Sequence, residues 1–200
     1  MIYEMNKTDL HKDYWEAKYK NNTTGWDIGY IATPIKEYID QLKNKQLKIL
    51  IPGAGNSYEA TYLLQRGFQY ISVLDIAEQP LQNIMNRVST FPKRNLIQQN
   101  FFEHTDTYDL IIEQTFFCAI HPDLRLKYVE KMNHLLNSNG KLAGLFFNFE
   151  LTEEGPPFGG NINEYKSLFS TYFNIKVLEK CYNSIKARSD RELFFIFEKK

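Results

Sequence analysis

The sequence has no excess charge of either sign and no apolar stretch long enough to cross a membrane. Lys plus Arg and Asp plus Glu each number 24, so no net charge attracts nucleic acid or an anionic lipid surface. The most apolar run, KLAGLFFNF at 141–149, is far shorter than the roughly 20 residues that span a bilayer. We therefore expect a small-molecule partner, with neither nucleic acid nor a membrane as a partner.

Cysteine is scarce, because Cys118 and Cys181 are the only two. They form neither a CxxC pair nor a Cys/His cluster, so the sequence predicts no metal site and no redox pair. A secretory signal is also lacking, since residues 1–20 mix charges of both signs where an uninterrupted apolar stretch is needed. We expect a cytoplasmic protein that is a monomer or a weak dimer.

Repeats, low-complexity tracts and long Gly/Ser linkers are absent too, which argues against a solenoid and against two loosely joined domains. A chain of 200 residues is long enough for one domain with a sizeable core. We expect a single domain over residues 1–200, in which 1–45 form a helical cover and 46–200 form the core around a sheet.

The chain does contain a regular alternation of short apolar runs and helical patterns. Three of the helical patterns have helix-starting residues, with Ser57 as a cap and Pro80 and Pro122 in first turns. A fourth helix is expected at about 161–172. The apolar runs have the length and composition of buried parallel strands, and they lie at 47–51, 70–75, 95–99, 108–113 and 141–149.

The C-terminal part differs in pattern from the rest of the chain. Two further apolar runs, at 174–182 and 191–200, are joined by a polar segment and predict an antiparallel pair. The whole pattern predicts an α/β fold with a doubly wound, mostly parallel sheet of seven strands. Helices are expected on both faces of this sheet, and its last strand is expected to be antiparallel.

The segment LKILIPGAGNSYEA places two glycines between a predicted strand and a predicted helix. Gly53 and Gly55 allow a ligand to approach the backbone and the helix N-terminus closely, as in nucleotide-binding α/β units. Asp75, followed by Ile76, ends the second predicted strand, where a carboxylate accepts hydrogen bonds from both hydroxyls of a ribose. Together these features predict a cofactor that contains adenosine, held by both glycines, Asp75 and Ile76.

Tyr58 distinguishes between two such cofactors. A dinucleotide site has a third glycine at this position of its GxGxxG motif, so that the helix packs closely beneath a pyrophosphate. An aromatic residue there argues against NAD and favours S-adenosylmethionine (SAM), which has no phosphate. After the third predicted strand, Asn100 and Phe101 are expected to contact the adenine. The alternative for this pair is an Asn in a turn and a Phe in the core.

Three further segments are WEAKYKNNTTGWDIGYIATP near the N-terminus, IIEQTFFCAIHPDLR in the middle and EEGPPFGGNINEY near the C-terminus. With them the chain resembles the thiopurine methyltransferase family, including its plant halide and thiol methyltransferase branch, from Trp15 to about Tyr165. The resemblance implies a SAM-dependent methyltransferase whose product is S-adenosylhomocysteine. It also implies that Trp15 and Trp26 enclose the cofactor and that the two glycines face its methionine part.

An acceptor site is expected next to the cofactor. Phe116, Pro157 and Phe158 are expected to form part of an apolar wall that desolvates a nucleophile. Arg125 either guides an anionic acceptor or pairs with Glu130 on the helix surface.

A soft acceptor such as a thiol, thiopurine, sulfide, halide or metalloid anion needs no strong base, and the sequence offers no convincing His/Asp pair. We therefore expect no catalytic acid or base, only alignment of the reactants and exclusion of water. Gln114 stands at the boundary of cofactor and acceptor, where relatives place an Arg or a Tyr. This departure leaves open a catalytically silent SAM or nucleoside binder, and an NAD-dependent oxidoreductase is the third alternative.

Overall fold

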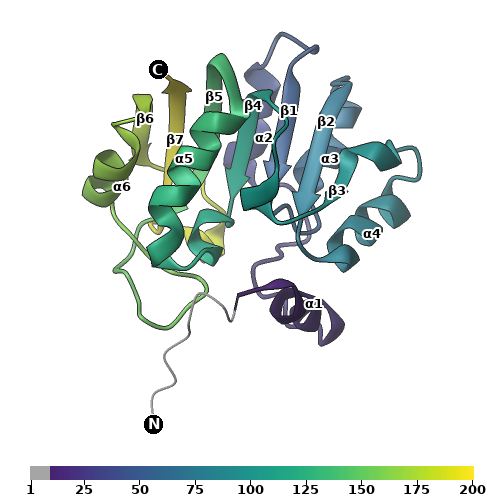
Figure 1. Ribbon diagram of the computed structural model, residues 1–200, viewed down its shortest axis with the longest axis horizontal. Coiled ribbons are helices and arrows are strands. Elements are labelled where there is room, and N and C mark those ends of the chain that lie inside the picture. Colours follow the sequence, from purple (N-terminus) through teal and green to yellow (C-terminus); the bar gives the residue numbers. More distant parts are fainter. Residues whose placement is uncertain (1–9) are drawn as a thin grey trace.

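A computed structural model describes residues 10–200 of the protein, so residues 1–9 of the predicted N-terminal cover lie outside the described part. Seven strands form one sheet in the order β3-β2-β1-β4-β5-β7-β6 (Figure 1). The strands are β1 Lys48–Pro52, β2 Tyr70–Asp75, β3 Leu96–Gln98, β4 Tyr108–Gln114, β5 Leu136–Phe147, β6 Phe173–Lys180 and β7 Glu192–Lys199.

The strand directions follow from the connections between the strands. β1 pairs in parallel with β2 and β4, β2 with β3, and β4 with β5. β7 lies between β5 and β6 and is antiparallel to both. The prediction of a mostly parallel sheet with an antiparallel last strand is therefore confirmed.

Helices cover both faces of the sheet, as the doubly wound fold requires. The α-helices are α1 Lys12–Lys20, α2 Thr33–Gln41, α3 Tyr58–Gln65, α4 Glu78–Arg87, α5 Arg125–Leu135 and α6 Ile162–Phe169. Short 3-10 helices are η1 Lys93–Asn95, η2 Phe101–Glu103, η3 Phe117–Ala119, η4 Pro122–Leu124 and η5 Lys186–Arg188.

Two hydrophobic cores lie on the two faces because successive side chains of a strand point to opposite sides. In β1, Leu50 belongs to the core that contains residues of α5 and α6. Its neighbours Ile49 and Ile51 belong to the core that contains residues of α2, α3 and α4. The continuous apolar runs seen in the sequence are thus strands that are buried on both faces.

Three predicted helix starts differ from the structure. Ser57 precedes α3, but its φ of 43° is left-handed and its side chain makes no capping hydrogen bond, so the capping role was wrong. The reason is that Ser57 continues the tight turn of the glycine segment. α4 begins at Glu78, before Pro80, and Pro122 starts the 3-10 turn that precedes α5.

α1 belongs to neither helical layer and lies beneath the carboxyl ends of β1, β2 and β4 (Figure 1), where Glu16 accepts a hydrogen bond from the N–H of Glu78, the first residue of α4, at 2.6 Å. None of its residues is buried. Within residues 10–200, no helix has the length and apolar character needed to cross a bilayer.

Candidate active site

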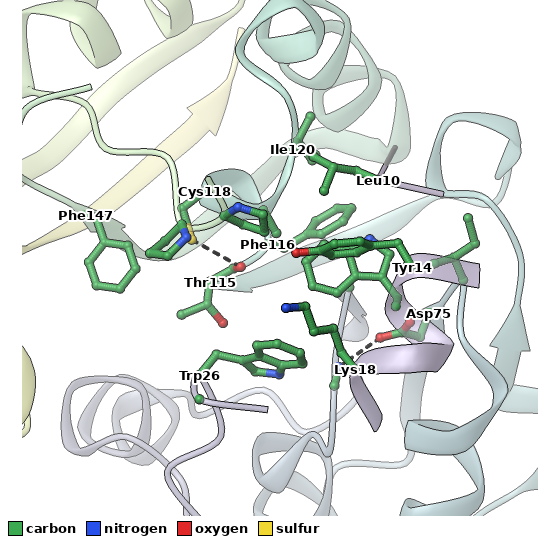
Figure 2. A pocket seen from close by; sticks show the side chains of 18 of the residues that line it. Leu10, Tyr14, Lys18, Trp26, Asp75, Thr115, Phe116, Cys118, Ile120 and Phe147 are labelled. Atoms are coloured by element: carbon green, nitrogen blue, oxygen red, sulfur yellow. Dashed lines mark hydrogen bonds between the residues drawn. The ribbon is translucent and has the colours of Figure 1, made fainter. Parts of the chain in front are cut away.

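A cavity of about 600 Å³ lies at the carboxyl ends of the central strands, between the sheet and α1 (Figure 2). Its volume is typical of a site for a small molecule. It brings together ten of the residues that the sequence predicts for the site: Trp15, Trp26, Gly53, Gly55, Asp75, Ile76, Asn100, Phe101, Phe116 and Pro157.

The glycine turn, Gly53 to Gly55, forms the floor of the cavity. Both glycines have left-handed backbone, with φ of 54° and 53°, a conformation that glycine adopts without steric cost. A Cβ atom on Gly53 would lie 2.0 Å from the Phe116 ring, and one on Gly55 would lie 3.2 Å from the Tyr19 hydroxyl oxygen. A side chain is therefore excluded at Gly53 and strained at Gly55, and the backbone of the turn faces the cavity.

Asp75 places a buried carboxyl group at the end of β2. One of its oxygens accepts from the Gly55 N–H at 3.0 Å and the other from the Ala77 N–H at 2.9 Å. Burial raises the pKa of this carboxyl to about 6, and the backbone donors only partly oppose the shift. Each oxygen keeps acceptor capacity for a ligand in the cavity.

Aromatic side chains from α1 and the following loop roof the cavity. The ring centroids of Trp15 and Trp26 are 5.5 Å apart, and those of Tyr19 and Trp26 are 5.8 Å apart, both edge to face. Arg188 Nη2 donates to the backbone oxygen of Trp26 at 2.7 Å, which ties this loop to η5. Tyr19 lies four residues after Trp15, so helical spacing alone indicates that the two side chains share one face.

Glu113 organises the end of β4, and sequence analysis missed it. Its side chain is fully buried and accepts from the N–H groups of Phe116 at 2.8 Å and Phe117 at 3.1 Å, and from the Tyr128 hydroxyl. Burial raises the pKa of Glu113 to about 7. These bonds fix the turn that directs Phe116 over Gly53.

Asn100 and Phe101 have the structural roles that the sequence offered as the alternative, an Asn in a turn and a Phe in the core, and they also line the cavity. Asn100 Oδ1 accepts from the Phe102 N–H at 3.0 Å and so forms the turn that starts η2. Phe101 is 4% exposed and packs edge to face on Phe116, with ring centroids 5.1 Å apart. Both residues nevertheless line the cavity, and their contact with adenine stays a prediction.

Arg125 and Phe158 do not line the cavity, which corrects their predicted place at the acceptor. The Arg125 side chain is 4% exposed and donates to Glu164 and to the backbone oxygen of Gly159, so the predicted partner Glu130 was also wrong. Phe158 is 1% exposed and is held by a backbone bond to Cys118. Both side chains are buried in the protein interior and do not reach the cavity.

Gln114 faces a second, smaller space. This recess of about 50 Å³ adjoins the glycine turn and is also lined by Ser57 and Glu59. The Gln114 Oε1 and Ser57 Oγ atoms are buried without hydrogen-bond partners in the described residues. Burial raises the pKa of Glu59 to about 7.

Several lining residues escaped sequence analysis because the fold brings them from distant segments. Phe147 and Phe149 follow from the end of β5, and Arg188 and Arg191 come from the segment before β7. No local spacing links these segments to the glycine turn. The antiparallel insertion of β7 beside β5 places them at one edge of the cavity.

Comparisons with known proteins agree with this geometry. A model of the family described as thiopurine S-methyltransferase matches residues 10–199. Probable thiol methyltransferase 2 of Arabidopsis thaliana is 27% identical over 159 residues, which cover 77% of this chain and 70% of the plant protein. Thiopurine S-methyltransferase of Acinetobacter baylyi is 23% identical over 196 residues, which cover 86% of this chain and 89% of the bacterial protein.

A solved structure shares the fold. It is that of Burkholderia thailandensis 1,6-didemethyltoxoflavin-N1-methyltransferase, with bound 1,6-didemethyltoxoflavin and S-adenosylhomocysteine. The TM-score is 0.78 at 15% sequence identity, over 100% of this chain and 92% of that chain. Because the family model matches all but the last of the described residues, this chain belongs to the thiopurine S-methyltransferase family.

Proposed function

We propose that this protein transfers the methyl group of SAM to a small soft nucleophile such as a thiol, thiopurine, sulfide, halide or metalloid anion. The observation that carries the proposal is the buried Asp75 carboxyl group, which faces a cavity of cofactor size beside the glycine turn. Relatives named for thiol and thiopurine acceptors support sulfur as the acceptor atom.

The residues at the cavity fit SAM. The Asp75 carboxylate keeps lone pairs for two ribose hydroxyls, and the glycine turn leaves room for the methionine part. Trp15 and Trp26 present aromatic rings, which attract a sulfonium through their electron-rich faces. Asn100 and Phe101 would hold the adenine.

SAM, when bound, supplies an electrophilic methyl group on a positively charged sulfur. The protein's part is to align the acceptor and to exclude water. Phe116, Phe147, Phe149 and Pro157 line the part of the cavity that we call the acceptor side, where an anionic acceptor loses its hydration. Cys118 lies there too, but burial raises the pKa of its thiol well above the ordinary range, so it stays a neutral thiol.

Titration calorimetry and product analysis test this proposal against its alternatives. The protein is expected to bind S-adenosylhomocysteine more tightly than NADH, and to form an S-methyl product from SAM and at least one member of a thiol panel. Binding of S-adenosylhomocysteine without turnover on thiols, iodide, selenite or a thiopurine would favour a silent binder. Tighter binding of NADH would overturn the cofactor assignment.

Cofactor affinity is expected to depend on pH through Asp75. The carboxylate form accepts two hydroxyl hydrogen bonds, so binding favours that form and lowers the pKa in the complex. Affinity for S-adenosylhomocysteine is therefore expected to be constant above pH 7 and to fall as pH drops through the free-protein pKa of about 6. Titrations at pH 8, 6 and 5 measure this change, with Asp75→Asn as the control. If the affinity of Asp75→Asn for S-adenosylhomocysteine fell with pH as steeply as that of the wild type, the pH dependence would belong to other groups.

We also infer a reducing, cytoplasmic location for this activity. Cys118 and Cys181 are both free thiols, and a soft thiol acceptor is retained in its reduced form in that compartment.

A further inference from the structure

Lys18 of α1 brings a positive charge into a cavity that is otherwise largely apolar and aromatic. The side chain lines the cavity, and Figure 2 shows it extending from α1 with its ammonium group on the side of Thr115 rather than that of Asp75. Its Nζ atom lies 5.1 Å from the centroid of the Tyr14 ring. The ammonium group therefore lies toward the Thr115 side of the cavity.

Among the residues that the structure describes, no carboxylate forms an ion pair with Lys18. Two arginines also line the cavity, and of these Arg188 has an ion pair, whereas Arg191, like Lys18, has none among the described residues. Arg188 pairs with Glu192 at 3.5 Å and holds the Trp26 backbone oxygen. Arg191 lies over the Phe149 ring, 4.6 Å from its centroid. Lys18 thus keeps its charge available to a ligand.

The surroundings of Lys18 strengthen its attraction for an anion. Tyr14, Trp26 and the phenylalanines of the acceptor side surround it with apolar surface, and charges attract more strongly where the effective dielectric constant is below that of bulk water. An anion that lost its hydration on these apolar walls without a cation nearby would be bound poorly. Asp75 is the only carboxylate among the described lining residues. In Figure 2 it lies on the side of the cavity away from the Lys18 ammonium group and Thr115.

We propose that Lys18 binds the negative charge of the methyl acceptor and selects anionic acceptors, thiolates and halides, over neutral ones. This inference rests on the proposed function and makes Lys18 a specificity-determining residue of the same site. In the transfer, the acceptor lone pair forms the new bond to the methyl carbon, and the electron pair of the broken carbon–sulfur bond stays on the cofactor sulfur. The methylated product is neutral, so Lys18 no longer attracts it and it can leave.

Another source of negative charge is the carboxylate of the cofactor's methionine part. If Lys18 bound that carboxylate, removing the Lys18 side chain would weaken binding of the cofactor rather than binding of the acceptor. An acceptor anion and a cofactor carboxylate therefore predict different losses in the same variant. The first predicts weaker acceptor binding, and the second predicts weaker cofactor binding.

The test compares Lys18→Met with the wild type and with Lys20→Met, which removes the same charge from an exposed position of α1. The probes are 4-nitrobenzenethiolate, which is anionic at neutral pH, and its neutral S-methyl ether. Both are titrated into protein saturated with S-adenosylhomocysteine, and quenching of the fluorescence of Trp15 and Trp26 is measured. These are the only tryptophans, and both line the cavity.

Lys18→Met is expected to weaken thiolate binding at least tenfold, with less than twofold changes for the neutral ether and for S-adenosylhomocysteine. Lys20→Met is expected to change none of the three. In turnover, KM for the thiolate is expected to rise while kcat at saturation is largely kept.

A tenfold loss of S-adenosylhomocysteine affinity with unchanged thiolate binding would overturn the proposal and assign Lys18 to the cofactor carboxylate. Equal losses for thiolate and ether would also overturn it, since they would show a steric role. A wild type that binds S-adenosylhomocysteine but not the thiolate would refute the anion site while leaving the cofactor assignment intact.

Discussion

Asp75→Ala is expected to weaken S-adenosylhomocysteine binding at least tenfold while the protein stays folded. Hydrogen bonds to a charged acceptor contribute about 1.5 to 3 kcal/mol each, and about 1.4 kcal/mol corresponds to a tenfold change in affinity. The fold is expected to survive because the N–H groups of Gly55 and Ala77, which lose their acceptor, lie next to a cavity that water can enter. Titration calorimetry measures the loss, and thermal unfolding monitors the fold.

Asp109→Ala is the matched control for this change. Asp109 also accepts a backbone hydrogen bond, from the Lys48 N–H at 2.9 Å, but it does not line the cavity. Its removal is expected to lower the unfolding temperature without changing affinity. If Asp75→Ala bound S-adenosylhomocysteine as well as the wild type did, the ribose would have to lie elsewhere.

Gly53→Ala is expected to lower both stability and cofactor affinity, the latter at least tenfold. A left-handed backbone at a residue with a Cβ costs about 1 to 2 kcal/mol, and the added atom would lie 2.0 Å from the Phe116 ring. The ring cannot shift freely, because it packs on Phe101 and Tyr128 and Glu113 fixes its backbone. The turn is therefore expected to deform at the place where the methionine part would lie.

The control for this prediction is Gly25→Ala. Gly25 also lines the cavity, but a Cβ atom there meets nothing within 4 Å and its backbone is not left-handed. This variant is expected to match the wild type in unfolding temperature and in affinity. Full affinity in Gly53→Ala would show that the turn tolerates a side chain and is not shaped for a close ligand.

Local patterns were sufficient to predict the sheet and the proximity of the glycine turn to Asp75. The alternation of apolar runs specifies buried parallel strands, and in a parallel sheet the ends of β1 and β2 meet at one edge, so the glycine turn and Asp75 lie together. Their positions follow from the chain order alone. Their roles with a cofactor stay predictions until binding is measured.

The acceptor end was less predictable because it depends on which way side chains turn and on contacts between distant segments. Arg125 sits at the first turn of α5, and only the fold shows that Glu164 of α6 draws it into the interior. Lys18 lies within the segment WEAKYKNNTTGWDIGYIATP, but the segment alone does not show which way its side chain turns, and its position in the cavity depends on how α1 lies across the strand ends. The left-handed conformation of Ser57 likewise follows from the shape of the turn rather than from its residue type.

The absence of any buried residue in α1 has an evolutionary consequence. A helix that contributes nothing to the hydrophobic cores can accumulate substitutions without unfolding the protein, yet four of its residues, Tyr14, Trp15, Lys18 and Tyr19, border the ligand space. We therefore expect substitutions in this helix to change what the cavity binds more than they change the stability of the fold. A change of acceptor is expected to need substitutions in this short segment, while the sheet beneath it stays the same.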